Sequence, residues 1–315
     1  MKILVTGVAG FIGMHCAQRL LERGDEVLGV DNLSPYAPLQ LKKDRLAQLR
    51  HRRFRFRRLD LAGGAALAGL FRKEKPELVL HLAAQAGVRY SLENPAAYVQ
   101  SNLVGFANLL ECCRRHPPRH LAFASSSSVY GANRKLPWSE TDGVGPPLSF
   151  YAATKVANEL MAQAYSRAHG LRSTGLRYFT VYGPWGRPDM SPVLFARAIL
   201  KGEAIRVFNR GDMRRDFTYI DDAVEATLRL LDRPAKYAVY NIGNRRPVAL
   251  PAYIAALERA LGKKAKLKMA PMQPGDVKAT CADTRALKRA TGFAPATPLE
   301  RGLARFAQWI KQYPG

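Results

Sequence analysis

The chain has 315 residues, 47% of them hydrophobic, and its 49 Lys and Arg against 25 Asp and Glu give a net charge of +24. This length suits one large domain, or a large domain with a smaller one. No apolar run is long enough for a membrane-spanning helix, and the first residues lack the apolar stretch of a signal peptide. We therefore expect a cytoplasmic protein with no membrane partner.

The first half of the chain alternates short β-rich runs with longer amphipathic runs, a pattern typical of βαβ units around a parallel sheet. Strands are predicted at Lys2–Thr6, Glu26–Val30, Phe54–Leu59, Leu78–Leu82, Leu121–Ser125 and Ser173–Tyr178. Helices are predicted at Phe11–Arg23, Leu67–Lys73, Tyr98–Arg114 and Phe150–His169. The predicted fold class is α/β: a Rossmann-type doubly wound parallel sheet with a smaller C-terminal α/β lobe.

The texture changes after residue 180, where turns become dense and short strands and helices follow in mixed order. We predict a sheet domain over 1–180 and a second lobe over 181–315, some segments of which return to the first domain. The six histidines show no metal-ligand spacing and no Cys-x-x-Cys motif occurs, so we expect no metal site.

The segment 51–58 interleaves basic residues with Phe54 and Phe56. Such a segment can bind nucleic acid. It can also be an edge strand that turns its aromatic side chains inward and its arginines outward, where charge blocks edge-to-edge pairing. The run falls where the third strand of a 3-2-1-4-5-6 sheet is due, at the sheet edge. We favour the edge strand and expect no nucleic-acid partner despite the positive charge.

Three glycines, Gly7, Gly10 and Gly13, follow the first strand and open the first helix. This spacing allows a tight turn and close approach of backbone to a pyrophosphate, which sits on the helix N-terminus. We expect the intervening Phe11 and Ile12 to contact the cofactor as well. The motif therefore predicts a dinucleotide site.

The second and third predicted strands are each followed by acidic residues. Asp31 stands 24 residues after Gly7, where a carboxylate accepts hydrogen bonds from the adenosine ribose and repels a 2′-phosphate. Asn32 and the two residues after it include no Arg, so NAD is preferred over NADP. Asp60, followed by Leu61, suits the adenine edge, although a lone Asp here can equally cap a helix.

Tyr151 and Lys155 stand four residues apart on one face of a predicted helix. An ammonium and a positively charged nicotinamide both favour the phenolate, so we expect the pKa of Tyr151 to fall. Four serines, Ser125 to Ser128, follow the fifth strand, where ligands of open α/β sheets bind. The fourth strand ends beside them with Leu82, Ala83 and Ala84, which leave room for a dinucleotide. His81 is predicted to be a packed strand residue rather than a base.

Together these motifs resemble the extended short-chain dehydrogenase/reductases. The resemblance is carried by the following residues: Gly7-x-x-Gly10-x-x-Gly13, Asp31, His81-Leu-Ala-Ala, Asn102, Ser125-Ser-Ser-Ser-Val-Tyr-Gly131, Tyr151-x-x-x-Lys155 and Arg177-Tyr-Phe179. Within that superfamily, the segments 84–91, 181–190 and 213–222 resemble UDP-glucuronate 4-epimerases.

The resemblance implies a cycle around tightly held NAD, in which residues 1–180 bind the cofactor and 181–315 bind mainly the nucleotide sugar. Tyr151 would take the proton of the 4-hydroxyl while hydride leaves C4, and the 4-keto sugar would turn over before hydride returns. Lys155 would bind the nicotinamide ribose. Ser126 and Ser127 complete the predicted catalytic set, and Ser128 would lie near the substrate carboxylate.

The resemblance also assigns residues to the rest of the pocket. Asn102 and Tyr178 match positions that shape the cofactor pocket. The UDP-sugar would contact residues of the second lobe, of which Arg215 binds the diphosphate and Phe208 lines the uracil pocket; the others are Arg187, Asp276 and Thr180.

Several rival functions share this fold. Sugar-nucleotide 4,6-dehydratases need an Asp-Glu pair where this chain has Ser127 and Ser128, which argues against dehydration. A UDP-glucuronate decarboxylase that forms UDP-xylose, and a 4-epimerase of a neutral UDP-hexose, stay open as alternatives. A non-catalytic NAD-binding regulator is a third, although such proteins often lack the catalytic tyrosine. The resemblance further implies a homodimer through two helices of the first domain.

Overall fold

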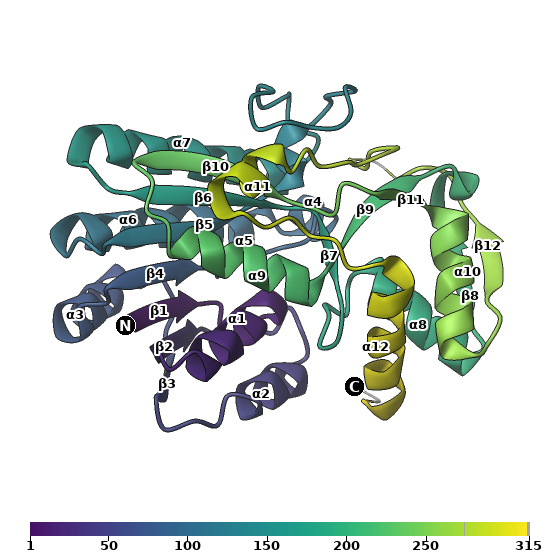
Figure 1. The fold of residues 1–315 in the computed structure, drawn as a ribbon, viewed down its shortest axis with the longest axis horizontal. Coiled ribbons are helices and arrows are strands. Elements are labelled where there is room, and N and C mark those ends of the chain that lie inside the picture. Colours follow the sequence, from purple (N-terminus) through teal and green to yellow (C-terminus); the bar gives the residue numbers. More distant parts are fainter. Residues whose placement is uncertain (274, 314–315) are drawn as a thin grey trace.

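The computed structural model describes residues 1–273 and 275–313 and divides into two lobes (Figure 1). The larger lobe is built on a seven-stranded parallel sheet, in the order β10-β6-β5-β4-β1-β2-β3. In chain order these strands are β1 (Lys2–Thr6), β2 (Glu26–Asp31), β3 (Phe54–Arg58), β4 (Leu78–His81), β5 (His120–Ser126), β6 (Ser173–Tyr178) and β10 (Tyr237–Ile242). The six predicted strands and their 3-2-1-4-5-6 order are thereby confirmed.

Helices cover both faces of this sheet, and the inner strands β1, β2, β4, β5 and β6 are accordingly buried on both sides. One face packs against α1 (Phe11–Glu22) and α9 (Ile220–Leu231), and its apolar core continues into the second lobe. The other face packs against α3 (Gly64–Glu74), α6 (Gly105–Arg115) and α7 (Phe150–His169). The helix α2 (Leu39–Ala47) follows β2.

The basic segment at the sheet edge forms β3, as predicted, and pairs only with β2 in the described sheet. Phe54 and Phe56 pack against the core that lies under α1. Arg55, on the opposite side of the strand, donates to the Glu26 and Glu74 carboxylates. The segment is therefore an integral part of the sheet.

One predicted helix is not continuous in the structure. The run Tyr98–Arg114 divides into α5 (Pro95–Tyr98), the π-helical η1 (Val99–Val104) and α6. Asn102 lies in the wide turn of η1, where its side chain bonds both backbone groups of Gln85 and the Thr154 hydroxyl. Such π-turns are frequent at functional sites, and here the wider turn points an amide into the protein.

The second lobe holds two small sheets and three longer helices, seen beyond β7 in Figure 1. The three-stranded sheet has the order β11-β9-β7 and the two-stranded sheet pairs β12 with β8. These strands are β7 (Thr180–Tyr182), β8 (Ala204–Val207), β9 (Arg214–Tyr219), β11 (Pro247–Ala249) and β12 (Lys266–Met269). The helices are α8 (Ser191–Lys201), α10 (Leu250–Leu261) and α12 (Leu299–Gln312), with the short η3 (Phe208–Gly211) after β8. Three other short elements, α4 (Tyr90–Glu93), η2 (Ser127–Tyr130) and α11 (Arg285–Thr291), pack against helices and strands of the larger lobe.

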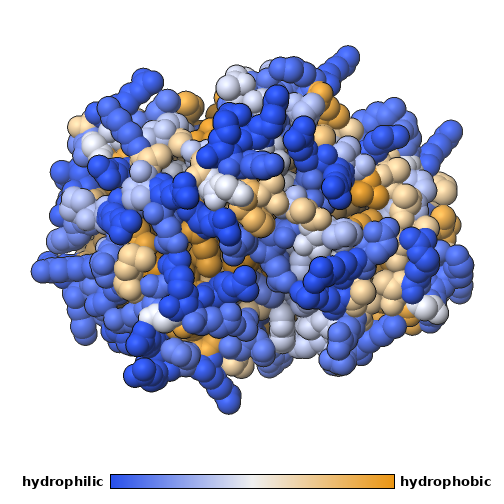
Figure 2. All heavy atoms as spheres, viewed as in Figure 1, coloured by the Kyte–Doolittle hydropathy of each residue, from blue (hydrophilic) through white to orange (hydrophobic). Residues whose placement is uncertain are grey.

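The chain does not divide at a single point between the two lobes. After contributing β7, β8 and β9 to the second lobe it returns, and α9 and β10 complete the larger sheet. That residues 1–180 bind NAD and residues 181–315 bind mainly the nucleotide sugar stays a prediction. Hydrophilic residues cover most of the face shown in Figure 2, with hydrophobic residues in small patches between them. Within residues 1–273 and 275–313, no helix has the length and hydropathy to cross a membrane.

Candidate active site

A cavity of about 460 Å³ lies at the carboxyl ends of the larger sheet's strands and reaches into the second lobe. Both the position and the size are typical of a small-molecule site in an open α/β sheet. The cavity is lined by most of the predicted site residues: Gly7, Gly10, Phe11, Ile12, Gly13, Asp31, Asn32, Asp60, Leu61, Leu82, Ala83, Ala84, Ser126, Ser127, Ser128, Tyr151, Lys155, Tyr178, Thr180, Arg187, Arg215 and Asp276.

The glycine turn at one end of the cavity is set by backbone geometry. Gly7 adopts φ +71°, and a Cβ there would lie 2.6 Å from the Ala83 nitrogen. A Cβ on Gly13 would collide with the Gly7 carbonyl oxygen. Gly10 caps α1 without a side chain, and the first turn of α1 carries no acidic residue. The open helix N-terminus fits the pyrophosphate of a dinucleotide.

The acidic residues after β2 and β3 lie beside this turn. The Asp31 carboxylate accepts the Ala9 and Leu33 amides at 3.1 and 2.8 Å, which fixes it at the mouth of the turn. The Asn32 amide donates to Asp60 at 3.0 Å. This set presents carboxylate oxygens where hydroxyl groups of a bound adenosine would lie, so the residues fit NAD.

Lys42 on α2 was not among the predicted residues, and it lies 3.6 Å from the Asp31 carboxylate. Arg45, one turn further along α2, is almost completely buried and donates to the Ala9, Trp185 and Gly186 carbonyl oxygens. Burial is the largest influence on Arg45, and it lowers the pKa of the guanidinium to about 10. Arg45 thus ties the glycine turn to the loop of the second lobe that carries Arg187.

At the centre of the cavity, α7 begins beside the end of β5. Ser149 caps α7 through the Ala152 amide, which places Tyr151 in the first turn. The Lys155 ammonium is buried and donates to the Ala124 carbonyl oxygen at 2.8 Å. Ser126 ends β5 and donates to the Ser128 hydroxyl at 3.1 Å. The serines and the Tyr–Lys pair thus meet at one place, as the motif spacing predicted.

The predicted fall in the pKa of Tyr151 is wrong for the protein without a bound nicotinamide. Burial raises this pKa, whereas the Arg187 guanidinium and the Ser126 hydroxyl lower it by less. The Lys155 nitrogen lies 6.0 Å from the centre of the tyrosine ring and is directed to Ala124. Burial lowers the pKa of Lys155 itself to about 8.

His81 is a packed strand residue, as predicted. Its Nδ1 lies 2.8 Å from the Thr6 hydroxyl, and its ring stacks on Phe106. Burial, helped by the nearby Lys155 ammonium, lowers the pKa of His81 to about 3. A neutral, fully packed imidazole cannot act as the base here.

The far end of the cavity is built from charged side chains that bind one another. Arg187 and Asp189 form a bidentate pair, with contacts of 2.6 and 3.1 Å, and Tyr36 donates to the same carboxylate. Arg215 donates to Asp276 at 2.6 Å. Neither Asp189 nor Tyr36 was predicted, because an Asp two residues after an Arg in a turn looks like an ordinary surface pair.

Two predicted residues do not line the cavity. Asn102 lies behind it and holds the segment 82–88, whose backbone forms part of the wall, through Gln85. Phe208 lies in η3, where its ring is covered by the Arg89 guanidinium at 5.2 Å. Asn102 therefore acts on the pocket through Gln85, and the uracil role of Phe208 stays a prediction.

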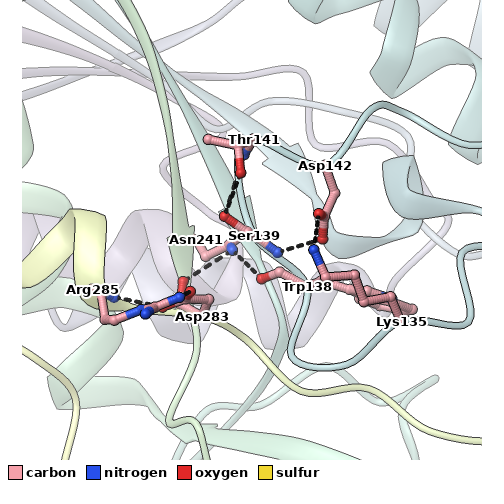
Figure 3. A network of polar contacts seen from close by, with 8 residues as sticks. All are labelled: Lys135, Trp138, Ser139, Thr141, Asp142, Asn241, Asp283 and Arg285. Carbon is pink, nitrogen blue, oxygen red and sulfur yellow. Dashed lines mark hydrogen bonds and ion pairs between the residues drawn. The ribbon is translucent and has the colours of Figure 1, made fainter.

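A loop between β5 and α7 contributes Trp138 to the cavity wall, and Figure 3 shows how it is held. Asn241 of β10 donates to the Trp138 and Asp283 carbonyl oxygens at 2.8 and 3.1 Å. Outside this contact, Lys135 pairs with Asp142 at 3.0 Å. The part of the chain that the structure describes contains no cluster of three or more His, Cys, Asp or Glu suited to a metal.

Comparison with known proteins agrees with this arrangement. A probable UDP-glucuronate 4-epimerase of Rhizobium meliloti is 45% identical, covering 99% of this chain and 97% of its own. The crystal structure of UDP-glucuronic acid 4-epimerase from Bacillus cereus, in complex with UDP-glucuronic acid and NAD, superposes with a TM-score of 0.93 at 35% identity, covering 99% of both chains. A UDP-glucose 4-epimerase from Thermotoga maritima, with UDP-glucose, gives 0.91 at 32% identity over 99% of each chain. Residues 3–243 match the NAD dependent epimerase/dehydratase family, and the chain belongs to that family.

Proposed function

We propose that this protein interconverts UDP-glucuronate and UDP-galacturonate by inverting C4 of the sugar around a bound NAD. The observation that carries the proposal is the meeting of the glycine turn, the serine cluster and Tyr151 in one cavity. The chain is similar over nearly its full length to UDP-glucuronate 4-epimerases, and this similarity supports the choice of sugar.

The glycine turn would hold the NAD pyrophosphate, and Asp31 would hold the adenosine ribose. When bound, NAD accepts a hydride from C4 of the sugar and returns it. The Lys155 ammonium, which already points toward the end of β5, would bind the nicotinamide ribose. The side chains at this end therefore bind and orient, and the protein itself handles only protons.

Tyr151 would take the proton of the sugar 4-hydroxyl at its phenolic oxygen and return it in the second half of the cycle. Ser126, beside it, would bond the same sugar oxygen and hold it in line. Burial raises the pKa of Tyr151 in the protein alone, so Arg187 and the charge of a bound nicotinamide supply the counteracting field.

The far end of the cavity suits the anionic parts of the substrate. Arg215 presents a guanidinium to a diphosphate, and Asp276 holds it in place. Ser127, Ser128 and Thr180 also line the cavity, and their hydroxyl groups can bind the hexuronate carboxylate. Fixing this carboxylate also matters because a 4-keto acid loses CO2 when the carboxylate can turn freely.

Incubation of the purified protein with UDP-glucuronate, without added NAD and then with it, tests the proposal by NMR analysis of the products. UDP-galacturonate is the expected product. UDP-xylose would identify a decarboxylase, and turnover of UDP-glucose alone would identify an epimerase of neutral hexoses. Tightly retained NAD without turnover of any UDP-sugar would identify a regulator.

Tyr151→Phe tests the mechanism within the same assay. The change removes the proton acceptor and little volume, so we expect kcat to fall by about 10²- to 10⁴-fold while NAD and UDP stay bound. Titration of UDP by calorimetry provides the binding control. Full activity in Tyr151→Phe would contradict the proposed mechanism.

We also propose that the protein forms a homodimer through the surface around α6 and α7. Leu160 on α7 is 58% exposed, and Val104, where η1 meets α6, is 36% exposed. Apolar side chains left in water on adjacent helices favour burial against a second copy. Analytical ultracentrifugation measures the state directly. The cytoplasmic location stays a prediction from the sequence.

A further inference from the structure

Glu159 stands one helical turn beyond Lys155 on α7, so Tyr151, Lys155 and Glu159 follow one another at intervals of four residues on one helix face. Tyr151 and Lys155 line the cavity, whereas Glu159 is buried behind them. A buried carboxylate costs free energy unless its oxygens are bonded. Its partners therefore indicate what the residue does.

The Glu159 carboxylate binds one residue from each of two neighbouring strands. Ser125 of β5 donates to it at 2.6 Å, and Arg177 of β6 donates through two nitrogens at 2.9 and 2.8 Å. Ser125 and Arg177 are register partners across the sheet. One side chain thus fastens α7 to both strands just where they end at the cavity.

Lys155 makes the adjacent contact, because it donates to Ala124, the residue before Ser125. Two neighbouring residues of β5 are thereby fixed to two successive turns of α7. A slip of the helix would break both contacts and move Tyr151 away from Ser126, which follows Ser125 in the same strand.

The charges around the lysine make Glu159 more than an anchor. Two residues face the Lys155 ammonium: Tyr151, one turn earlier on α7, and the neutral His81 of β4. Arg177 of β6 and the Tyr237 hydroxyl of β10, which donates to the Glu159 backbone oxygen, face Glu159 from the sheet. Burial lowers the pKa of Lys155 to about 8, and Glu159 acts against that fall.

We propose that Glu159 is a positioning residue for the reaction, which sets the register of α7 on β5 and supplies the negative charge that keeps Lys155 an ammonium. The inference rests on the proposed function for its kinetic consequence. Glu159 touches neither substrate nor cofactor, and it acts through Lys155 and Ser125.

Glu159→Gln tests the electrostatic part, because the amide keeps an oxygen for Ser125 but loses the charge. We expect the alkaline limb of the kcat profile, which follows loss of the Lys155 proton, to move down by about one pH unit. Activity at pH 8 would then fall by about fivefold, with KM little changed. An NMR titration of ¹³C-labelled lysine measures the same shift at Lys155 without turnover.

Glu74→Gln is the matched control. Glu74 is an equally buried carboxylate held by two nitrogens of Arg55, far from the cavity. Both variants should melt at a lower temperature, but only Glu159→Gln should move the pH limb and the lysine titration. Glu159→Asp, which retains the charge, should restore the limb position and leave a lower kcat.

The proposal is overturned if the Lys155 titration in Glu159→Gln matches that of the wild type. Should the single variant fail to fold, Glu159→Gln/Arg177→Met removes both charges together and permits the same titration, because no lone buried charge is left. If the wild type shows no epimerase activity, the proposed function fails, whereas the lysine titration still decides the role of Glu159.

Discussion

At the dinucleotide end of the cavity the glycine turn is shaped by close backbone contacts, whereas at the opposite end charged side chains bind one another. The turn around Gly7 takes its shape from a positive φ and from contacts that leave no room for a Cβ. The far end depends on the Arg187–Asp189 and Arg215–Asp276 pairs. The glycine turn is therefore a rigid backbone site. At the far end, by contrast, a ligand can replace one member of each ion pair.

Because the two ends are built differently, they would respond differently to substitution. A rigid backbone site loses its binding geometry when a side chain is added, because the peptide groups that collide with it cannot move aside. When one residue of a charged cluster is removed, the electrostatic potential in the cavity changes in part, and the remaining side chains can take new partners. Effects of substitution at the glycine turn should therefore be large, and effects at the far end should be smaller and pH-dependent.

Gly7→Ala should have the largest effect. The new Cβ would meet the Ala83 backbone nitrogen at 2.6 Å and would strain a left-handed φ. We expect the Kd for NAD to rise by about 100-fold, which corresponds to about 2.7 kcal/mol. Calorimetry with NAD measures it. Gly69→Ala is the control, since nothing lies within 4 Å of a Cβ built on Gly69. An unchanged Kd for NAD in Gly7→Ala would show that the turn is not a rigid backbone site.

Arg187→Met should have a smaller effect that depends on pH. Arg187 lowers the pKa of Tyr151, so its removal leaves burial less opposed and the pKa of Tyr151 rises. The rising limb of kcat/KM, which follows the deprotonated tyrosine, should move up by about one pH unit. Activity near pH 7 then falls by about tenfold from this cause.

The position of the limb, measured across pH, separates this electrostatic effect from weaker substrate binding, which lowers the whole profile. Arg229→Met serves as the control, since it removes an arginine whose ion pair with Glu225 is exposed. If the Arg187→Met profile keeps its shape and only drops, Arg187 binds substrate without setting the Tyr151 field.

Lys135→Met should have the smallest effect. Its pair with Asp142 lies on the outer side of the Trp138 loop, and the lysine side chain is 72% exposed. An exposed pair contributes about 0–1 kcal/mol, so we expect the melting temperature to change by about 3 °C at most. Differential scanning calorimetry checks this, and a change in KM above about twofold would show that the outer pair helps to hold the Trp138 wall.

Much of the fold could be predicted because apolar alternation and glycine position are local properties of the chain. The six strands and the edge position of β3 follow from them. The π-helical turn at Asn102 could not be predicted, since it depends on Gln85, which lies seventeen residues away in sequence. The strand β10 was not predicted because 237–242 resembles any short β-rich run of the second half.

The site residues divide in the same way. Those in fixed motifs, such as Gly7, Tyr151 and Ser126, line the cavity as their spacing implied. Lys42 and Arg45 were missed because a helix with three basic residues resembles a solvated surface helix, and only the fold turns it inward. The direction of the Tyr151 pKa was wrong for the protein without a bound nicotinamide, because sequence spacing carries no measure of burial.

The return of the chain through α9 and β10 also determines how the protein can be made and divided. Until β10 is synthesised, β6 is an open edge whose N–H and C=O groups lack their partner strand, and the sheet face under α9 is uncovered. A nascent chain that ends near residue 180 therefore presents a template for aggregation. The larger lobe is complete only after three strands of the second lobe have been synthesised, so neither lobe can be exchanged between relatives by one cut of the gene.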